Sequence, residues 1–102
     1  MKHVYLAALH ALGFTQKQLF QASKEFEDIS ALYESLSSSQ LGKLGIGQDK
    51  SQKILEKKEN LSVSDLEKVL AQRKVQLVTF FDAEYPESLK QLSSPPFLLY
   101  VR

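Results

Sequence analysis

The apolar residues of this chain repeat at helical spacing as far as residue 73, and then the period changes. Ile29, Leu32, Tyr33 and Leu36 fall at i, i+3, i+4 and i+7, the spacing of one buried helical face. From Val75 to Phe81 the residues are mostly β-branched or aromatic, which favours a strand. The pattern predicts a mainly α chain, with a helical domain at 1–73 and the start of a second domain at 74–102.

Glycines and capping residues divide the first part into five to six short helices. The apolar run from Val4 to Leu12 ends at Gly13, a residue type that commonly ends helices. A serine run precedes a short fourth helix that ends near Leu44, and the fifth helix ends near Asn60. Three pairs match the capping box that opens a helix: Thr15 with Gln18, Asp49 with Gln52, and Ser64 with Glu67.

The C-terminal third predicts two short strands with a short helix between them. Pro86 suits the first position of a helix that reaches Leu92, because proline lacks the N–H that this position leaves unused. A second strand is expected from Phe97 to Val101. Two strands alone make a marginal sheet, so we expect the sheet to continue in sequence that follows Arg102.

Composition excludes several classes of function. The chain has no cysteine, so it has no disulfide framework, no thiolate nucleophile and no cysteine zinc site. His3 and His10 are expected to be ordinary boundary residues, since nothing supplies a third metal ligand. No catalytic arrangement is recognisable, and the run from Val4 to Leu12 is too short to span a membrane. We expect a cytoplasmic protein that is not an enzyme and has no cofactor, metal or membrane contact.

The segment from Leu41 to Ile54 resembles a helix-hairpin-helix motif. Gly45 and Gly47 allow a tight turn between helices, which aims backbone N–H groups outward at the start of the next helix. The candidate phosphate-binding residues are Gly45, Ile46, Gly47, Lys50 and Lys53. The alternative is a hairpin that only joins two helices. A related segment, Leu9 to Phe14, lacks the second glycine and is expected to be a degenerate first hairpin.

Two motifs near the C-terminus carry a family resemblance. The first is Asp82-x-x-Tyr85-Pro86-x-x-Leu89, and the second runs from Ser94 to Arg102 through Pro95, Pro96, Leu99 and Tyr100. Together they are similar to the entry segment of the Rossmann-like domain in the DprA (Smf) family of DNA-processing proteins. Many members of that family carry a sterile alpha motif-like (SAM-like) or helix-hairpin-helix domain before it. We expect the eight motif residues to pack rather than bind a ligand.

The resemblance implies a parent protein that binds single-stranded DNA, loads RecA during natural transformation and forms a dimer. Those activities would belong to sequence after Arg102, which leaves this chain as an accessory DNA- or protein-interaction module. Two alternatives stay open: a SAM-like protein-interaction domain without DNA binding, and a standalone duplex-binding hairpin module.

The charge of the chain limits its own affinity for DNA. Thirteen Lys and Arg oppose twelve Asp and Glu, a formal net charge of +1. Because no aromatic-lined basic groove is evident either, we expect the chain alone to bind single-stranded DNA weakly near physiological salt.

Overall fold

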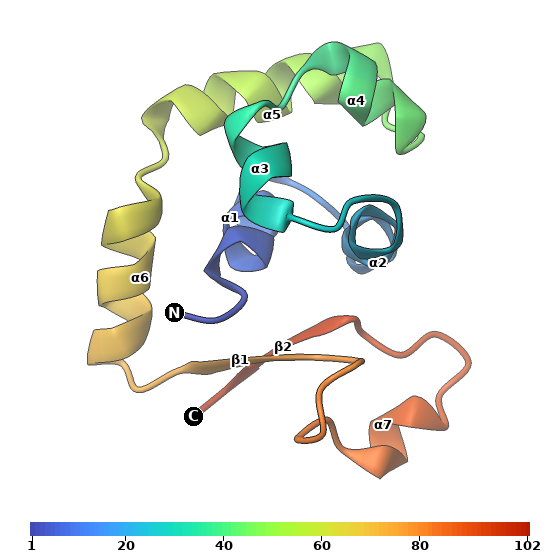
Figure 1. The fold of residues 1–102 in the computed structure, drawn as a ribbon, viewed down its shortest axis with the longest axis vertical. Coiled ribbons are helices and arrows are strands. Elements are labelled where there is room, and N and C mark those ends of the chain that lie inside the picture. The colour runs from blue at the N-terminus through green and yellow to red at the C-terminus, as the bar shows by residue number, and fades with distance from the viewer.

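The computed structural model describes residues 1–102 as seven helices and a two-stranded antiparallel sheet (Figure 1). The mainly α architecture predicted from the sequence is confirmed. The elements are α1 (Val4–Leu12), α2 (Gln16–Glu25), α3 (Ile29–Glu34), α4 (Ser38–Lys43), α5 (Gln48–Asn60), α6 (Val63–Gln72), β1 (Gln76–Thr79), α7 (Glu87–Lys90) and β2 (Leu98–Val101).

The helix starts confirm one predicted cap and correct two. Thr15 caps α2 in a complete capping box, in which its hydroxyl accepts from Gln18 N at 3.1 Å and the Gln18 side chain accepts from Thr15 N at 2.9 Å. Asp49, predicted as a cap, lies inside the first turn of α5, whose N-cap is Gly47.

Ser64 was likewise predicted as the cap of α6, but Ser62 holds that position and accepts from Asp65 N at 3.2 Å. The predicted partner of Ser64, Glu67, instead pairs with the amino group of Met1. In α3 the helix ends at Glu34, so Leu36 follows it, although Leu36 is still buried.

The strands are shorter than predicted but pair directly with each other. Gln76 lies opposite Val101 and Thr79 lies opposite Leu98 in an antiparallel register. Phe80 and Phe97, expected within the strands, lie just outside them, yet Phe80 N donates to Phe97 O at 2.9 Å and extends the pairing. Phe81, also expected in the strand, belongs to the turn that follows.

The helix between the strands is a single turn. Pro86 is its N-cap, with φ −63° and ψ 130°, rather than its first helical residue. The ψ value is extended, so the helix begins one residue later, and it ends at Lys90 instead of Leu92.

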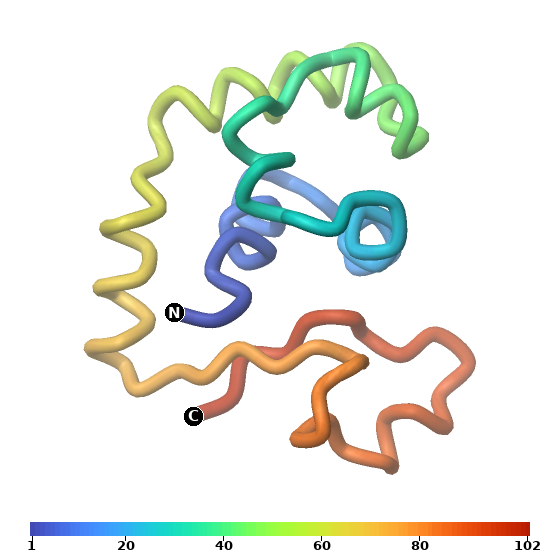
Figure 2. Tube along the Cα trace, in the orientation of Figure 1, coloured from blue at the N-terminus to red at the C-terminus, as the bar shows by residue number.

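Helix α1 lies at the centre of the molecule and packs against α2, α3, α5 and α6 (Figure 1). Nineteen buried residues form one hydrophobic cluster, which includes Leu77, Phe97 and Leu98 from the β segment. The trace in Figure 2 places the N-terminal residues beside the sheet, where His3 contacts Asp82. The helical part and the β segment therefore share one core, while the division into domains at 1–73 and 74–102 stays a prediction. None of the helices combines the length and the apolar character that crossing a membrane requires.

Candidate functional site

The turn between α4 and α5 has the geometry of a tight helical hairpin. Gly45 has φ 78°, a left-handed conformation that favours glycine. Its N–H donates to Gly42 O at 3.0 Å, and Ile46 N donates to Leu41 O at 3.0 Å, which closes the end of α4. The Ile46 side chain is buried in the core. The turn is therefore anchored from inside, with Gly45 and Gly47 exposed on either side of Ile46.

The first backbone N–H groups of α5 have no hydrogen-bond acceptor in the protein. Gly47, its N-cap, has φ −65° and ψ 161° and no side chain to accept a hydrogen bond. No acceptor in the protein takes the backbone N–H groups of Gln48, Asp49 or Lys50. Unsatisfied amides at the positive end of a helix dipole are suited to binding an anion such as a phosphate group.

A second turn of the same form lies 32 positions earlier, between α1 and α2. Gly13 has φ 120°, its N–H donates to His10 O at 3.1 Å, and Phe14 N donates to Leu9 O at 3.1 Å. Phe14, like Ile46, is buried. The expected degenerate first hairpin thus has the backbone hydrogen bonds of the second one.

The starts of α2 and α5 are in contact through residues at equivalent positions. Lys50 Nζ donates to Gln18 Oε1 at 3.3 Å, and these residues are also 32 positions apart. Contact between equivalent residues is what a two-fold relation between two copies of a motif produces. The starts of α2 and α5 differ in capping, because Thr15 accepts from the Gln18 amide and Gly47 accepts from none.

The lysines near the open helix start are not equally available. Lys50 is half-buried and engaged with Gln18, whereas Lys53 and Lys57 are exposed on α5 and take part in no ion pair. Asp49 is exposed in the first turn and brings a negative charge to the same place. Of the predicted phosphate-binding residues, Gly45, Gly47 and Lys53 are exposed, while Ile46 can offer only its backbone.

The C-terminal motif residues make structural contacts. Asp82 accepts from Thr79 N at 2.8 Å and from His3 Nε2 at 2.8 Å, and Lys2 Nζ lies 3.4 Å from its other oxygen. Partial burial opposes ionisation of Asp82, but these hydrogen bonds and the charges of His3 and Lys2 outweigh it and lower its pKa. Asp82 therefore ties the N-terminal residues to the end of β1.

Tyr85 is buried, and its hydroxyl donates to the carbonyl of Pro96, which joins the two motifs. Burial raises the pKa of Tyr85. Tyr100 is hydrogen-bonded at 2.8 Å to His10, whose ring stacks against it. Pro86 caps α7, Leu89 and Leu99 are half-buried, and Pro95 and Pro96 lead into β2.

Both histidines therefore make structural contacts that the sequence did not reveal. Each joins the first helix or its approach to the β segment, His3 to Asp82 and His10 to Tyr100. Their partners lie 79 and 90 residues away in the sequence, so no local pattern marks them.

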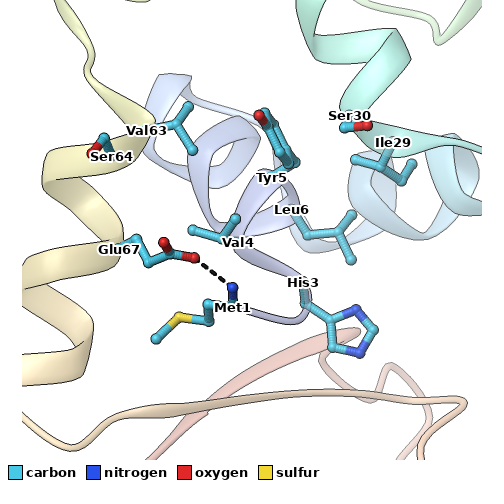
Figure 3. Close-up of a pocket in the computed structure, with 10 residues that line it drawn as sticks. All are labelled: Met1, His3, Val4, Tyr5, Leu6, Ile29, Ser30, Val63, Ser64 and Glu67. Carbon is cyan, nitrogen blue, oxygen red and sulfur yellow. Dashed lines mark hydrogen bonds and ion pairs between the residues drawn. The ribbon is translucent and has the colours of Figure 1, made fainter.

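An open cavity of about 500 Å³ lies between α1, α3 and α6 (Figure 3). Its lining residues are Met1, His3, Val4, Tyr5, Leu6, Ile29, Ser30, Val63, Ser64 and Glu67. Figure 3 shows the amino group of Met1 paired directly with the Glu67 carboxylate in its lining. This pairing neutralises both charges, and no group of three or more His, Cys, Asp or Glu residues is placed to hold a metal ion.

No protein-family model matches this chain, and no curated protein or solved structure matches it. The open start of α5 is accordingly the candidate site on its geometry alone.

Proposed function

We propose that this chain is a non-catalytic helix-hairpin-helix module that contacts the phosphate backbone of DNA through residues 45–50. The observation that carries the proposal is the uncapped start of α5, where three backbone N–H groups lack acceptors beside two exposed glycines. Glycines leave no side chain in the way of a backbone phosphate. Lys53 and Lys57 add positive charge on the same helix.

Such a contact holds DNA without reading its sequence, because the phosphate backbone is the same for every base. Two related hairpins facing each other suit the two strands of a duplex. The capping box at Thr15 closes the first hairpin, so the second one supplies the stronger contact.

The C-terminal motifs support a place for this module in a DNA-processing protein of the DprA kind. In such a protein, binding of single-stranded DNA, dimer formation and loading of RecA belong to the Rossmann-like domain that follows. The contacts of Asp82, Tyr85 and Pro96 are consistent with this, since all three residues are occupied within the fold.

One observation favours the alternative function, a SAM-like module that docks a protein partner. Asp49 places an exposed carboxylate in the first turn of α5, where it interacts favourably with the helix dipole and repels a phosphate. The net charge of +1 gives no general attraction to DNA either.

The deciding experiment adds a side chain that can cap the start of α5. Gly47 has the extended conformation of an N-cap, and a Cβ there meets no atom within 4 Å, so Gly47→Ser supplies a capping hydroxyl without strain. We expect Gly47→Ser to stabilise the fold by a few tenths of a kcal/mol and to weaken binding of a DNA duplex. Amide NMR shifts of residues 45–51 during a titration at low salt measure the binding.

Matched variants separate the amide contact from charge. The slope of log affinity against log salt is negative, and Lys53→Gln is expected to reduce its magnitude by about 0.9, whereas Lys68→Gln on α6 leaves it unchanged. Unshifted amides at residues 45–51 under excess duplex, or equal binding by Gly47→Ser and the unmodified chain, would overturn the phosphate contact and favour protein docking.

A further inference from the structure

Four phenylalanines from distant parts of the chain meet at the surface. Phe20 comes from α2, Phe80 and Phe81 follow β1, and Phe97 precedes β2. The Phe20 ring lies 5.9 Å from that of Phe81 and 5.6 Å from that of Phe97, between centroids. Phe97 is buried, but Phe20 is 37% and Phe81 65% exposed. We call these four residues the phenylalanine cluster.

A cavity of about 380 Å³ opens beside the phenylalanine cluster, within the range of small-ligand sites. It is lined by Gln16, Lys17, Phe20, Phe80, Ser94, Pro95 and Phe97. The Gln16 side chain accepts from Leu98 N at 2.8 Å and donates to Leu98 O at 3.2 Å. This pair of hydrogen bonds holds α2 against β2, so the walls of the cavity are fixed by the fold.

The charge around this cavity is positive. Lys17, Phe20 and Lys24 fall at i, i+3 and i+7, on one face of α2, and Lys24 Nζ lies 5.3 Å from the centre of the Phe20 ring. Neither lysine takes part in an ion pair.

The acidic groups on the facing segment are occupied or lie elsewhere. Glu87 is 3.8 Å from Lys90, Asp82 is held by His3 and Lys2, and Glu84 lines a different cavity beside Met1. The cavity is therefore lined by the rings of Phe20, Phe80 and Phe97 and by the unpaired Lys17. Phe81 and Lys24, which both contact the Phe20 ring, lie beside it.

We propose that this cavity binds an unstacked base of single-stranded nucleic acid. Phe81, which is 65% exposed beside the cavity, supplies the ring on which a base stacks. Lys17 in the lining and Lys24 over the Phe20 ring contact the neighbouring phosphates. Gln16 is occupied by the backbone of Leu98, so little remains to read a base edge, and binding tolerates any sequence. The folded chain thus brings together aromatic rings and lysines from α2 and the β segment that the sequence alone did not place side by side.

This site is separate from the hairpin and does not depend on the proposed duplex contact. Helix α2 lies between them: Gln18 contacts Lys50 on one side, and Gln16 contacts Leu98 on the other (Figure 1). Two phosphate contacts on a single strand predict a slope of log affinity against log salt of only about −1.4, which agrees with weak binding near physiological salt.

Titration of the chain with an eight-residue oligothymidylate at about 20 mM salt, followed by NMR, tests the proposal. We expect shifts in the ring signals of Phe20 and Phe81 and in the amides of residues 16–24. Phe81→Ala should weaken binding about tenfold, because each stacked base contributes strongly. Val69→Ala, which shortens an exposed apolar side chain on α6, is the matched control and should bind normally.

The charge is tested by the double variant Lys17→Gln with Lys24→Gln, which should bring the salt slope close to zero while Lys68→Gln leaves it unchanged. Phe81 is largely exposed, so its truncation should leave the fold intact, as near-ultraviolet circular dichroism can verify. Gly47→Ser should leave oligothymidylate binding unchanged, so loss of the duplex contact alone does not affect this proposal.

Three outcomes would overturn the proposal. The first is oligothymidylate binding that Phe81→Ala does not weaken. The second is equal or tighter binding of a Glu- and Phe-containing peptide of the same length, which would make the cavity a protein-docking site. The third is a concentration-dependent dimer in sedimentation that Phe81→Ala abolishes while the oligonucleotide causes no shift.

Discussion

At the scale of single residues, Gly45 and Gly42 have opposite requirements although they are three positions apart. Gly45 has φ 78°, and a Cβ there would meet no atom within 4 Å, so its constraint is conformational rather than steric contact with a neighbour. Gly42 lies inside α4, where its Cβ would also meet open space.

Alanine at these two positions should therefore change stability in opposite directions. We expect Gly45→Ala to lower the free energy of unfolding by about 1 kcal/mol, because an L side chain is strained in the left-handed region. Gly42→Ala should raise it by roughly 0.5 to 1 kcal/mol, because alanine is the better helix former. Urea denaturation of both variants measures the difference, and changes of the same sign would contradict the backbone assignment.

Asp82 makes a pH-dependent contribution to stability. Its pKa in the folded protein lies below the ordinary value of 3.8, so the unfolded chain binds more protons in the interval between the two values. The contribution is complete above the unfolded pKa and is lost as the pH falls through the lowered folded pKa. The stability difference between the unmodified chain and Asp82→Asn should be constant above about pH 5 and shrink below about pH 4.

Urea unfolding at a series of pH values tests this expectation. Asp82→Asn retains an oxygen that can accept from Thr79 N, so the variant chiefly removes the charge that His3 and Lys2 face. A difference that persists unchanged at pH 2 would show that ionisation of Asp82 is not what stabilises the fold.

At the scale of elements, the contact between α2 and β2 depends on the side chain of Gln16. Leu98 is 1% exposed, and its backbone N–H and carbonyl are both bonded to Gln16. Gln16→Ala should destabilise the fold by about 1 to 3 kcal/mol, because the buried backbone groups lose their partner. Lys17→Ala, next on the same helix but exposed, should change stability by less than about 0.5 kcal/mol. Thermal denaturation of the pair provides the comparison.

At the scale of the whole molecule, the helices and the β segment should unfold together. Leu98 and Leu77 belong to the same buried cluster as Leu9 and Leu41. Leu98→Ala should therefore lower the midpoint temperature of helix melting, followed by far-ultraviolet circular dichroism. The midpoint followed by tyrosine fluorescence should fall with it. Helix melting that stays at its original midpoint while the tyrosine signal shifts would show two independently folding parts.

Local chemistry in the sequence was enough to predict much of the fold. The stripe at Ile29, the capping box at Thr15 and the turn at Gly45 all rest on residues within a few positions of one another. The structure contains the capping box and the turn, and α3 holds the stripe as far as Tyr33, while Leu36 lies beyond its end. The change of period at Val75 likewise marks the entry to β1. These signals are reliable because helix periodicity, capping and left-handed glycine act over single turns.

Choices between similar local signals needed the tertiary structure. Ser62 and Ser64 are each followed three positions later by an acidic residue, and either pair fits a capping box. Ser62 is the cap in the folded chain, where Glu67 pairs with the amino group of Met1. That contact joins residues 66 positions apart, so a local pattern does not contain it.

The sequence by itself determined where most helices lie, how the glycine turn is made and that the helices come before the strands. Only the tertiary structure decided which amides stay open at α5, how His3 and His10 join the first helix to the sheet, and that Phe20 meets Phe81. The physical reason is range, because caps and turns are satisfied within a few residues, whereas these contacts form only when the shared core brings distant segments together.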